Sequence, residues 1–218
     1  MKKKKFSNRF GRVAHALLAP LARFLLRVRV HGRENVPAEG GAVVAINHIS
    51  FLDVIAVSAS FPGARMPRYL AKAELFRIPI VSSLIRALGA IPLDRGGSDV
   101  GAVRRAIEVA DGGELLGLFP QGTRQKGKNP ADTRIKPGVA MIAAKAKCPI
   151  LPVCIRIKKQ RYALLRRVDV IIGEPLMPGP LGLLDESPNY REAANAAFRE
   201  LCALGGYTPS LLPESSEK

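Results

Sequence analysis

The sequence predicts an α/β fold, and three observations support that class. From about residue 27 onward, apolar runs of strand length alternate with stretches of helical periodicity. The chain has 218 residues, 47% of them hydrophobic and 24% charged, so it can bury a substantial core. No internal repeat or interdomain linker interrupts the alternation. We therefore expect one domain over residues 29–208, preceded by a distinct segment at 1–28 and followed by a loose tail at 209–218.

Each predicted element follows from its spacing of apolar residues. Short apolar runs predict strands at 28–31, 42–47, 68–71, 90–93, 115–119, 150–157 and 168–172. Longer segments with apolar residues three or four positions apart predict helices at 51–60, 80–88, 100–110, 138–147 and 190–203.

The N-terminal segment carries most of the net charge. The whole chain has 34 basic and 18 acidic residues, which gives +16. Residues 1–33 hold ten of the Lys and Arg residues and no acid, so they supply +10 of that total. Charge concentrated in this way indicates a polyanionic partner, either nucleic acid or an anionic membrane surface.

On a helical wheel, residues 9–28 separate into a basic sector and an apolar sector. This pattern is typical of a helix, or a helix pair broken at Pro20, that lies in a membrane interface. The expected membrane contacts are Phe10, Arg12, Leu17, Leu21, Arg23, Phe24 and Leu25. A surface helix packed on its own core and a cleaved signal peptide are alternatives. We expect no nucleic-acid partner, because the second face is apolar rather than polar or aromatic.

Cysteine usage bears on the cellular compartment of the protein, and the lengths of uncharged runs bear on whether it spans a membrane. The three cysteines, Cys148, Cys154 and Cys202, fit neither a closed disulfide framework nor a zinc pattern, which favours a reducing, intracellular compartment. The longest uncharged runs have 13 residues, at 40–52 and 201–213, so a conventional membrane-spanning helix is not expected.

The first motif that could carry chemistry spans residues 47–53 and reads Asn-His-Ile-Ser-Phe-Leu-Asp. It lies where a predicted strand runs into a helix, a common place for ligand sites in α/β sheets. Asp53 could hold one imidazole nitrogen of His48 while the other accepts a proton from a hydroxyl. Alternatively, Ser50 and Asp53 form a helix capping box and His48 is a buried structural residue.

The second motif, residues 119–124, reads Phe-Pro-Gln-Gly-Thr-Arg and also follows a predicted strand. A glycine turn with a hydroxyl and a guanidinium is a plausible phosphate cradle. Further charged residues are expected near the same ends of the sheet, namely Lys72, Asp94, Arg95 and Lys136. Together with Arg124, the cations among them could surround a phosphate.

The two motifs, in this order and about 70 residues apart, resemble blocks of the glycerolipid acyltransferase family. The family's Asn-His-x-Ser-x-x-Asp block is matched at 47–53, and its Phe-Pro-Glu-Gly-Thr-Arg block at 119–124, with Gln121 in place of Glu. A further block is matched at residues 89–95, with Lys72 and Glu74 upstream. Pro149 and Pro152 match a Pro-x-x-Pro strand, and residues 172–175 match the family's end strand. The likeness covers roughly residues 30–176.

The resemblance implies a mixed sheet flanked by helices and the transfer of a fatty acyl group from a thioester to a glycerolipid hydroxyl. The acceptor would be the sn-2 hydroxyl of 1-acylglycerol 3-phosphate (lysophosphatidic acid), and the donor acyl-CoA or an acidic acyl carrier protein. No metal or cofactor is implied. The reaction would take place at the cytoplasmic face of the cell membrane, on a peripheral (monotopic) protein that contacts anionic lipids.

The resemblance also implies a role for each matched residue. His48 would be the general base and Asp53 its partner. The acceptor phosphate would be bound by Arg124, Arg95, Lys72, Gly122 and Thr123. The acceptor would be oriented by Asn47, Ser50 and Gln121. Because Gln121 replaces the family's Glu, we expect an active variant with a changed acceptor preference. The alternatives are glycerol 3-phosphate, dihydroxyacetone phosphate or another lyso-lipid as acceptor, or a catalytically silent basic protein that binds membranes or nucleic acid.

Overall fold

The computed structural model describes residues 9–87, 90–93, 100–163 and 166–210. One seven-stranded sheet runs through the molecule in the order β1-β7-β6-β2-β5-β3-β4. The strands are β1 (Val28–His31), β2 (Ala42–Ile46), β3 (Arg68–Lys72), β4 (Ile91–Leu93), β5 (Leu115–Leu118), β6 (Ile150–Ile157) and β7 (Val168–Ile172). The β6–β7 pair is antiparallel and every other neighbouring pair is parallel, so the expected mixed sheet is confirmed.

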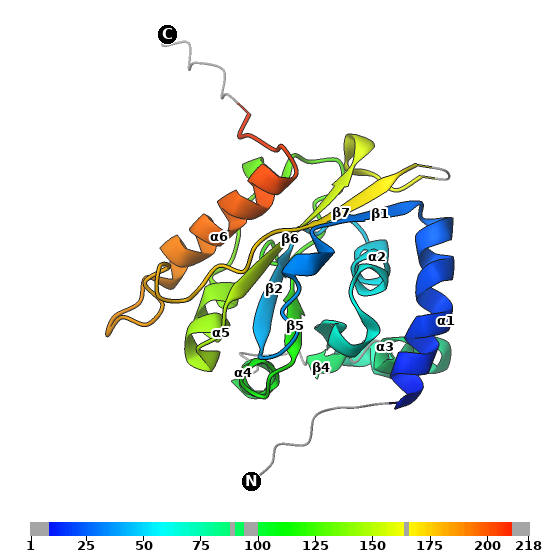
Figure 1. Cartoon of the computed structure of the whole chain (residues 1–218), viewed down its shortest axis with the longest axis horizontal. Helices are drawn as coiled ribbons and strands as arrows, with labels where there is room; N and C mark the ends of the chain where they lie inside the picture. The colour runs from blue at the N-terminus through cyan, green and yellow to red at the C-terminus, as the bar shows by residue number, and fades with distance from the viewer. Residues whose placement is uncertain (1–8, 88–89, 94–99, 164–165, 211–218) are drawn as a thin grey trace.

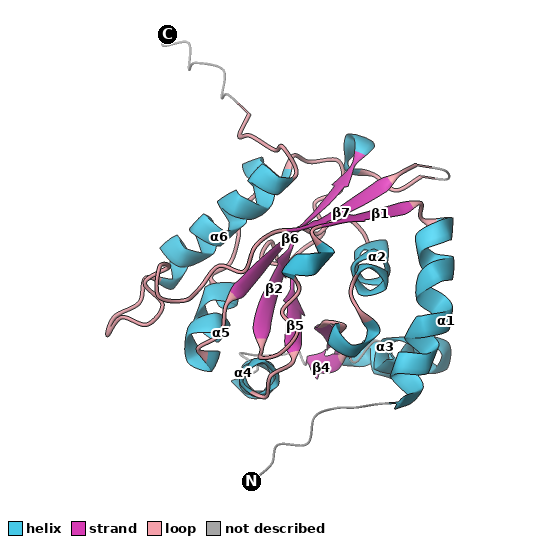
Figure 2. Cartoon of the chain, in the orientation of Figure 1, coloured by secondary structure: helices cyan, strands magenta, loops and turns pink. Residues whose placement is uncertain are grey.

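Helices cover both faces of this sheet (Figures 1 and 2). They are α1 (Arg9–Leu25), α2 (Leu52–Ser60), α3 (Pro79–Ala87), α4 (Val100–Asp111), α5 (Gly138–Ala146) and α6 (Tyr190–Leu204). The last three lie on one face, and α1, α2 and α3 lie on the other. Apart from α1, which is treated below, every predicted strand and helix is present, and each of their ends falls within one residue of the expected position.

The central strand β2 shows why the fold needs two layers of helices. All five of its residues are buried, as in a sheet covered on both sides. Val43 and Ala45 belong to the apolar core under α4, α5 and α6. Val44 and Ile46 belong to the core on the side of α2, together with Phe61. The alternation follows from the two-residue period of a strand.

The parallel strands bring several chain segments to one edge of the sheet. Because β2, β5 and β6 run in the same direction, the residues that follow them share that edge. These residues are 47–53 after β2, 119–124 after β5 and 158–162 after β6. The candidate site lies at this edge.

The N-terminal helix α1 continues through Pro20 as one helix, so the alternative of a helix pair is wrong over residues 9–25. It packs against α2, where His15 Nε2 lies 2.9 Å from the main-chain oxygen of Ser58, and Ala19 is buried. Its apolar stripe faces outward: Leu17 is 71% exposed and Phe24 79% exposed. Along the described stretches of chain, no helix combines the length and the apolar character needed to cross a membrane.

Candidate active site

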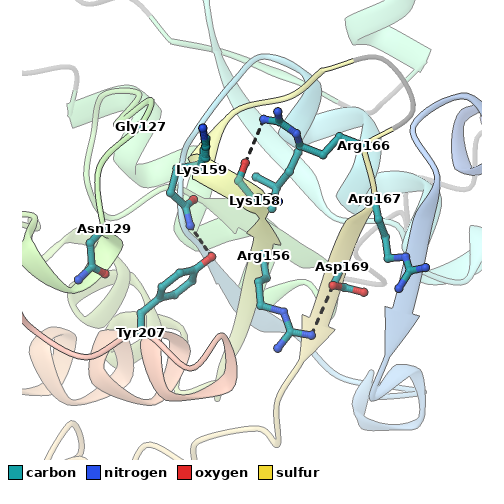
Figure 3. A pocket seen from close by; sticks show the side chains of 11 residues that line it. Gly127, Asn129, Arg156, Lys158, Lys159, Arg166, Arg167, Asp169 and Tyr207 are labelled. Carbon is teal, nitrogen blue, oxygen red and sulfur yellow. Dashed lines mark hydrogen bonds and ion pairs between the residues drawn. The ribbon is translucent and has the colours of Figure 1, made fainter.

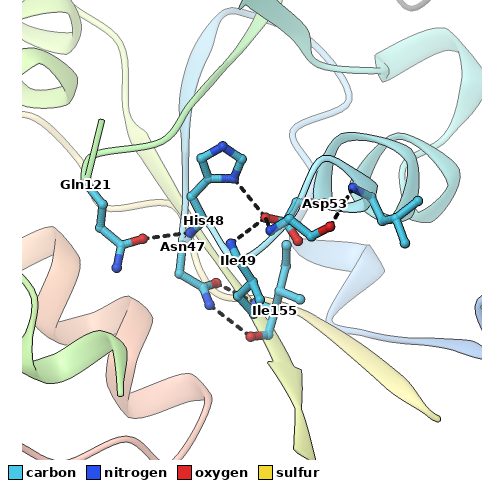
Figure 4. Close-up of polar contacts among 8 residues, drawn as sticks. Asn47, His48, Ile49, Asp53, Gln121 and Ile155 are labelled. Atoms are coloured by element: carbon cyan, nitrogen blue, oxygen red, sulfur yellow. Dashed lines mark hydrogen bonds and ion pairs between the residues drawn. The ribbon is translucent and has the colours of Figure 1, made fainter. Parts of the chain in front are cut away.

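His48 and Asp53 form a hydrogen-bonded pair where β2 ends and α2 begins (Figure 4). The Nδ1 atom of His48 lies 2.8 Å from Oδ2 of Asp53. Asp53 is fully buried, whereas 17% of the His48 side chain is exposed. Because an ionised carboxylate can only accept, we assign the proton to Nδ1, which leaves the lone pair of Nε2 free. An imidazole in this state can accept a proton from a substrate hydroxyl.

The Asp53 carboxylate also organises the turn before α2. Its Oδ2 atom accepts from the main-chain N–H groups of Ile49, at 2.6 Å, and Ser50, at 2.8 Å. The Ser50 hydroxyl in turn accepts from the N–H of Leu52 at 3.3 Å. Half of the expected capping box forms, because the Ser50 N–H donates to Asp53. The N–H of Asp53 donates to the main-chain oxygen of Ser50 at 3.2 Å and not to its hydroxyl. A structural and a catalytic role of Asp53 are compatible, since its Oδ2 atom accepts both from the turn and from the imidazole.

Two buried amides hold the His48 turn against neighbouring strands (Figure 4). Asn47 donates to the main-chain oxygen of Ile155 at 2.9 Å and accepts from its N–H at 2.7 Å. Gln121 accepts from the N–H of His48 at 2.7 Å and donates to the Thr133 hydroxyl at 2.6 Å. Both side chains are buried and use their amides within the protein. This placement does not fit the expectation that Asn47 and Gln121 orient the acceptor directly.

Aromatic rings cover one side of the imidazole. The ring of Phe119 stacks on His48 with centroids 4.0 Å apart and an interplanar angle of 23°. Tyr69 lies beyond Phe119, with centroids 6.2 Å apart. Burial raises the pKa of Tyr69, so its phenol stays neutral. The stack restricts rotation of His48 and excludes water from one face of its ring.

Tyr162 lies near the Asp53 carboxylate. Burial raises the pKa of Tyr162, and the negative charge of Asp53 raises it further. Its hydroxyl and Oδ1 of Asp53 are both buried, and neither has a hydrogen-bond partner among the described residues. The two groups are complementary, because a neutral phenol can donate to a carboxylate oxygen.

The turn after β5 brings a second set of predicted residues next to His48. Gly122 has φ of +69°, a left-handed conformation that favours glycine, and a side chain there would meet Lys136 at 3.2 Å. Arg124 is exposed and its guanidinium lies 3.9 Å from the ring centroid of Phe51. The N–H of Gln125 donates to the main-chain oxygen of His48 at 2.7 Å, which joins this turn to the loop that carries the imidazole.

Of the remaining predicted phosphate ligands, the structure describes Thr123 fully and Lys72 only by its backbone. Thr123 is exposed on the same turn, and its hydroxyl accepts from the Gln125 side chain at 3.1 Å. Lys72 ends β3, where its backbone pairs with Leu93, but its side chain lies outside the described part of the structure. Arg95 and Asp94 also fall outside the described residues.

Several residues of the site carry no local signal that would have revealed them. Thr133, Tyr162 and Ile155 lie outside the motifs and reach the site through other strands and loops. Phe51 and Phe119 stand inside the motifs, but only the fold shows that they stack on Arg124 and His48.

The cysteines stand apart from this site. All three are free and buried. Burial raises the pKa of Cys148 and of Cys202 to about 11, so both thiols are protonated at neutral pH. Over the described ranges, no group of three or more His, Cys, Asp or Glu side chains gathers as a metal site would require.

Comparison with known proteins gives one family. The family model described as Acyltransferase matches residues 27–156. A 1-acyl-sn-glycerol-3-phosphate acyltransferase of Bacillus subtilis is 30% identical over 179 residues, which are 80% of this chain and 87% of that protein. A protein of the same name from Borreliella burgdorferi is 34% identical over 133 residues, 60% of this chain and 51% of its own length. An uncharacterized protein of Mycobacterium tuberculosis is 29% identical over 204 residues, 82% of this chain and 55% of that protein.

A solved structure shares the fold. The crystal structure of the 1-acyl-sn-glycerophosphate (LPA) acyltransferase PlsC from Thermotoga maritima aligns with a TM-score of 0.62 and 28% identity. The alignment covers 93% of this chain and 79% of that one.

Proposed function

The chain belongs to the acyltransferase family, and on that premise we propose that it acylates the sn-2 hydroxyl of a 1-acylglycerol 3-phosphate, giving phosphatidic acid. The observation that carries the proposal is the His48–Asp53 pair, 2.8 Å apart, with Nε2 of the imidazole free to accept a proton. The names of the relatives support the acceptor, since two of them are called 1-acyl-sn-glycerol-3-phosphate acyltransferases.

The proposed reaction is a direct transfer between two bound substrates. Nε2 of His48 takes the proton from the acceptor hydroxyl as its oxygen forms a bond to the thioester carbonyl carbon. The carbon–sulfur bond breaks, and the proton on His48 passes to the departing thiolate. Asp53 stabilises the imidazolium that exists between these two proton transfers. No covalent intermediate on the protein is needed.

We assign the acceptor phosphate to the turn after β5. The turn that holds Gly122, Thr123 and Arg124 is bonded to the His48 loop through the N–H of Gln125, and Lys136 lies against Gly122. Stacking on Phe51 restricts the Arg124 side chain, which favours a fixed, bidentate contact with phosphate oxygens. We propose Lys72 and Arg95 as further ligands of the same phosphate.

We propose that α1 lies in the membrane interface, so that the active site meets its lipid substrate at the bilayer. The helix turns His15 and Ala19 toward the domain and leaves a Leu and Phe stripe outside. The exposed members of the stripe are Leu17, Leu18, Leu21, Phe24 and Leu25. A surface helix of a fully water-exposed protein has the opposite orientation, with its apolar face inward. This arrangement supports a peripheral, monotopic attachment.

A donor and acceptor panel tests the proposed activity. Purified protein would be supplied with acyl-CoA or acyl carrier protein thioesters and with lysophosphatidic acid, glycerol 3-phosphate, dihydroxyacetone phosphate or a lyso-lipid that lacks a phosphomonoester. We expect thiol release and phosphatidic acid formation with lysophosphatidic acid, and neither product with the His48→Ala variant. Greater kcat/KM on another acceptor would reassign the substrate, and no turnover on any acceptor would favour a silent binding protein.

A further inference from the structure

A pocket opens at the edge of the sheet where His48 lies, and Figure 3 shows it from close by. It surrounds the carboxyl end of β6 and the start of β7, and β6 is the direct neighbour of β2. Its volume is about 590 Å³, which is in the range of small-molecule sites. The basic residues that line it are Arg156, Lys158, Lys159, Arg166 and Arg167.

The pocket has more positive charge than its own residues neutralise. The acid in its lining is Asp169, which already pairs with Arg156 at 3.4 Å and with His31 at 3.2 Å. Arg166 donates to the main-chain oxygen of Lys158 at 3.0 Å and so braces the loop. Within the described chain, no hydrogen-bond or ion-pair partner is found for the side-chain nitrogens of Lys158, Lys159 or Arg167. Three such cations around one cavity favour an anion of more than one charge.

The loop after β6 is held in a strained conformation. Lys159 and Gln160 have φ of +59° and +47°, a left-handed backbone that residues with side chains rarely adopt. The loop is fixed there because the Gln160 main-chain oxygen accepts from Gly127 at 3.0 Å, while its side chain donates to the Tyr207 hydroxyl. Strain that the surroundings enforce in this way is found preferentially at ligand sites.

One loop connects this pocket with the proposed base. The N–H of Gln125 bonds to His48, and the N–H of Gly127, two residues later, bonds to Gln160. Along β6, Asn47 contacts Ile155, and Lys158 is three residues further, or about 10 Å at the rise of a strand. A ligand with anionic groups in the pocket and a reactive group at His48 would therefore have to bridge a separation of about 10 Å.

We propose that this pocket binds the phosphates of a CoA thioester, with the pantetheine arm running along the sheet edge to His48. The inference rests on the proposed acyl transfer, because it assigns the donor's binding site. A nucleotide with three phosphates at the far end of an extended thioester arm matches both the charge and the position of the pocket. A carrier protein would instead need a broad contact surface, of roughly 800 Å² on each partner.

Titration of the full chain with free CoA tests the assignment, and it requires no turnover. The test variant replaces Lys158, Lys159 and Arg167 by Gln. The matched control replaces Lys145, Lys147 and Arg191 by Gln, three exposed cations at the opposite edge of the sheet. We expect the Kd for CoA to rise at least about tenfold in the test variant, since charge-assisted bonds to phosphate are lost, and to change little in the control. With acyl-CoA, the donor KM should rise while the acceptor KM stays constant.

The possible outcomes distinguish CoA binding in the pocket from acyl transfer at His48. CoA binding that persists in His48→Ala but is lost in the test variant supports the pocket, whether or not transfer is observed. Equal Kd values in the test variant, the control and the unmodified chain overturn the assignment, even where acyl transfer is active. The assignment is also overturned if the test variant loses binding to an acyl carrier protein or to anionic vesicles but binds CoA as before. That result would identify the acidic protein or the lipid headgroup as the occupant of the pocket.

Discussion

The imidazole of His48 and the carboxylate of Asp53 are joined through the same oxygen that fixes the turn between them. Oδ2 of Asp53 accepts from His48 Nδ1 at 2.8 Å and from the N–H groups of Ile49 and Ser50 at 2.6 and 2.8 Å. One side chain therefore determines both the backbone of the loop and the tautomer of the proposed base. The structural and chemical roles of Asp53 can be separated only by substitutions that keep its shape.

The first prediction concerns this pair. His48→Ala should lower kcat by about 10²–10⁴-fold, the usual contribution of a general base. Asp53→Asn should keep the fold, because an amide oxygen can still accept from the turn, but it should lower kcat severely through loss of the charge that supports the imidazolium. Steady-state kinetics and thermal melting check both variants. Near-normal kcat in a folded His48→Ala protein would contradict the proposed mechanism.

The second prediction concerns Gln121, where the chain departs from the family pattern. Gln121 donates to Thr133 at 2.6 Å, and a Glu would lose that donor. Gln121→Glu should fold, with the free energy of unfolding reduced by about 1 kcal/mol. Because Gln121 is buried at 6% exposure, we expect the ranking of acceptors to stay the same.

A double-mutant cycle provides the control for Gln121. Combining Gln121→Glu with Thr133→Val should reveal a coupling of about 0.5–3 kcal/mol in denaturant unfolding, as for other residues in direct contact. A changed order of kcat/KM among the lyso-lipids in Gln121→Glu would instead restore the interpretation that position 121 selects the acceptor.

The third prediction concerns Tyr162. Its hydroxyl is buried, and the nearby Asp53 carboxylate contributes to its raised pKa. Tyr162→Phe should reduce kcat and leave the acceptor KM unchanged, because the side chain acts through Asp53 and not on the substrate. Tyr69→Phe is the matched control, because it keeps the stacked ring and removes only a buried hydroxyl that bonds to Ser58. If both variants lose the same activity, general loosening of the core explains the effect.

The fourth prediction concerns the acceptor phosphate. Arg124→Ala should raise the KM for a phosphate-bearing acceptor, and Arg124→Lys should restore little, because an ammonium neither stacks on Phe51 as a planar group nor binds bidentately. Arg95→Ala should act in the same direction. Arg134→Ala, another exposed arginine of the chain, serves as the control. Unchanged acceptor KM in both Arg124 variants and in Arg95→Ala would place the phosphate elsewhere.

The fifth prediction concerns membrane contact by α1. Replacing Leu17, Leu21 and Phe24 by Ser should abolish sedimentation with anionic vesicles and leave the melting temperature nearly constant, because all three side chains are exposed. The same change at Val100, Met177 and Leu184, which are also exposed, is the control. Equal vesicle binding by both variants and the unmodified chain would contradict the proposed attachment.

The sequence by itself determined the secondary structure and the local half of the site. The strand and helix ends of the domain were predictable to within one residue, because the spacing of apolar residues reports which side of a strand or helix is buried. The His48–Asp53 contact was also predictable, since the two residues are only five positions apart on a turn that enters a helix.

Only the tertiary structure decided the contacts between distant segments. Gln121 meets His48 across 73 positions and Asn47 meets Ile155 across 108, so no local spacing reveals these bonds. The same holds for the α1 stripe, because a helical wheel shows that two faces differ but not which one meets the domain. That choice depends on the packing of the whole chain, as does the strand order that places the basic pocket at β6 and β7 and makes β6 the neighbour of β2.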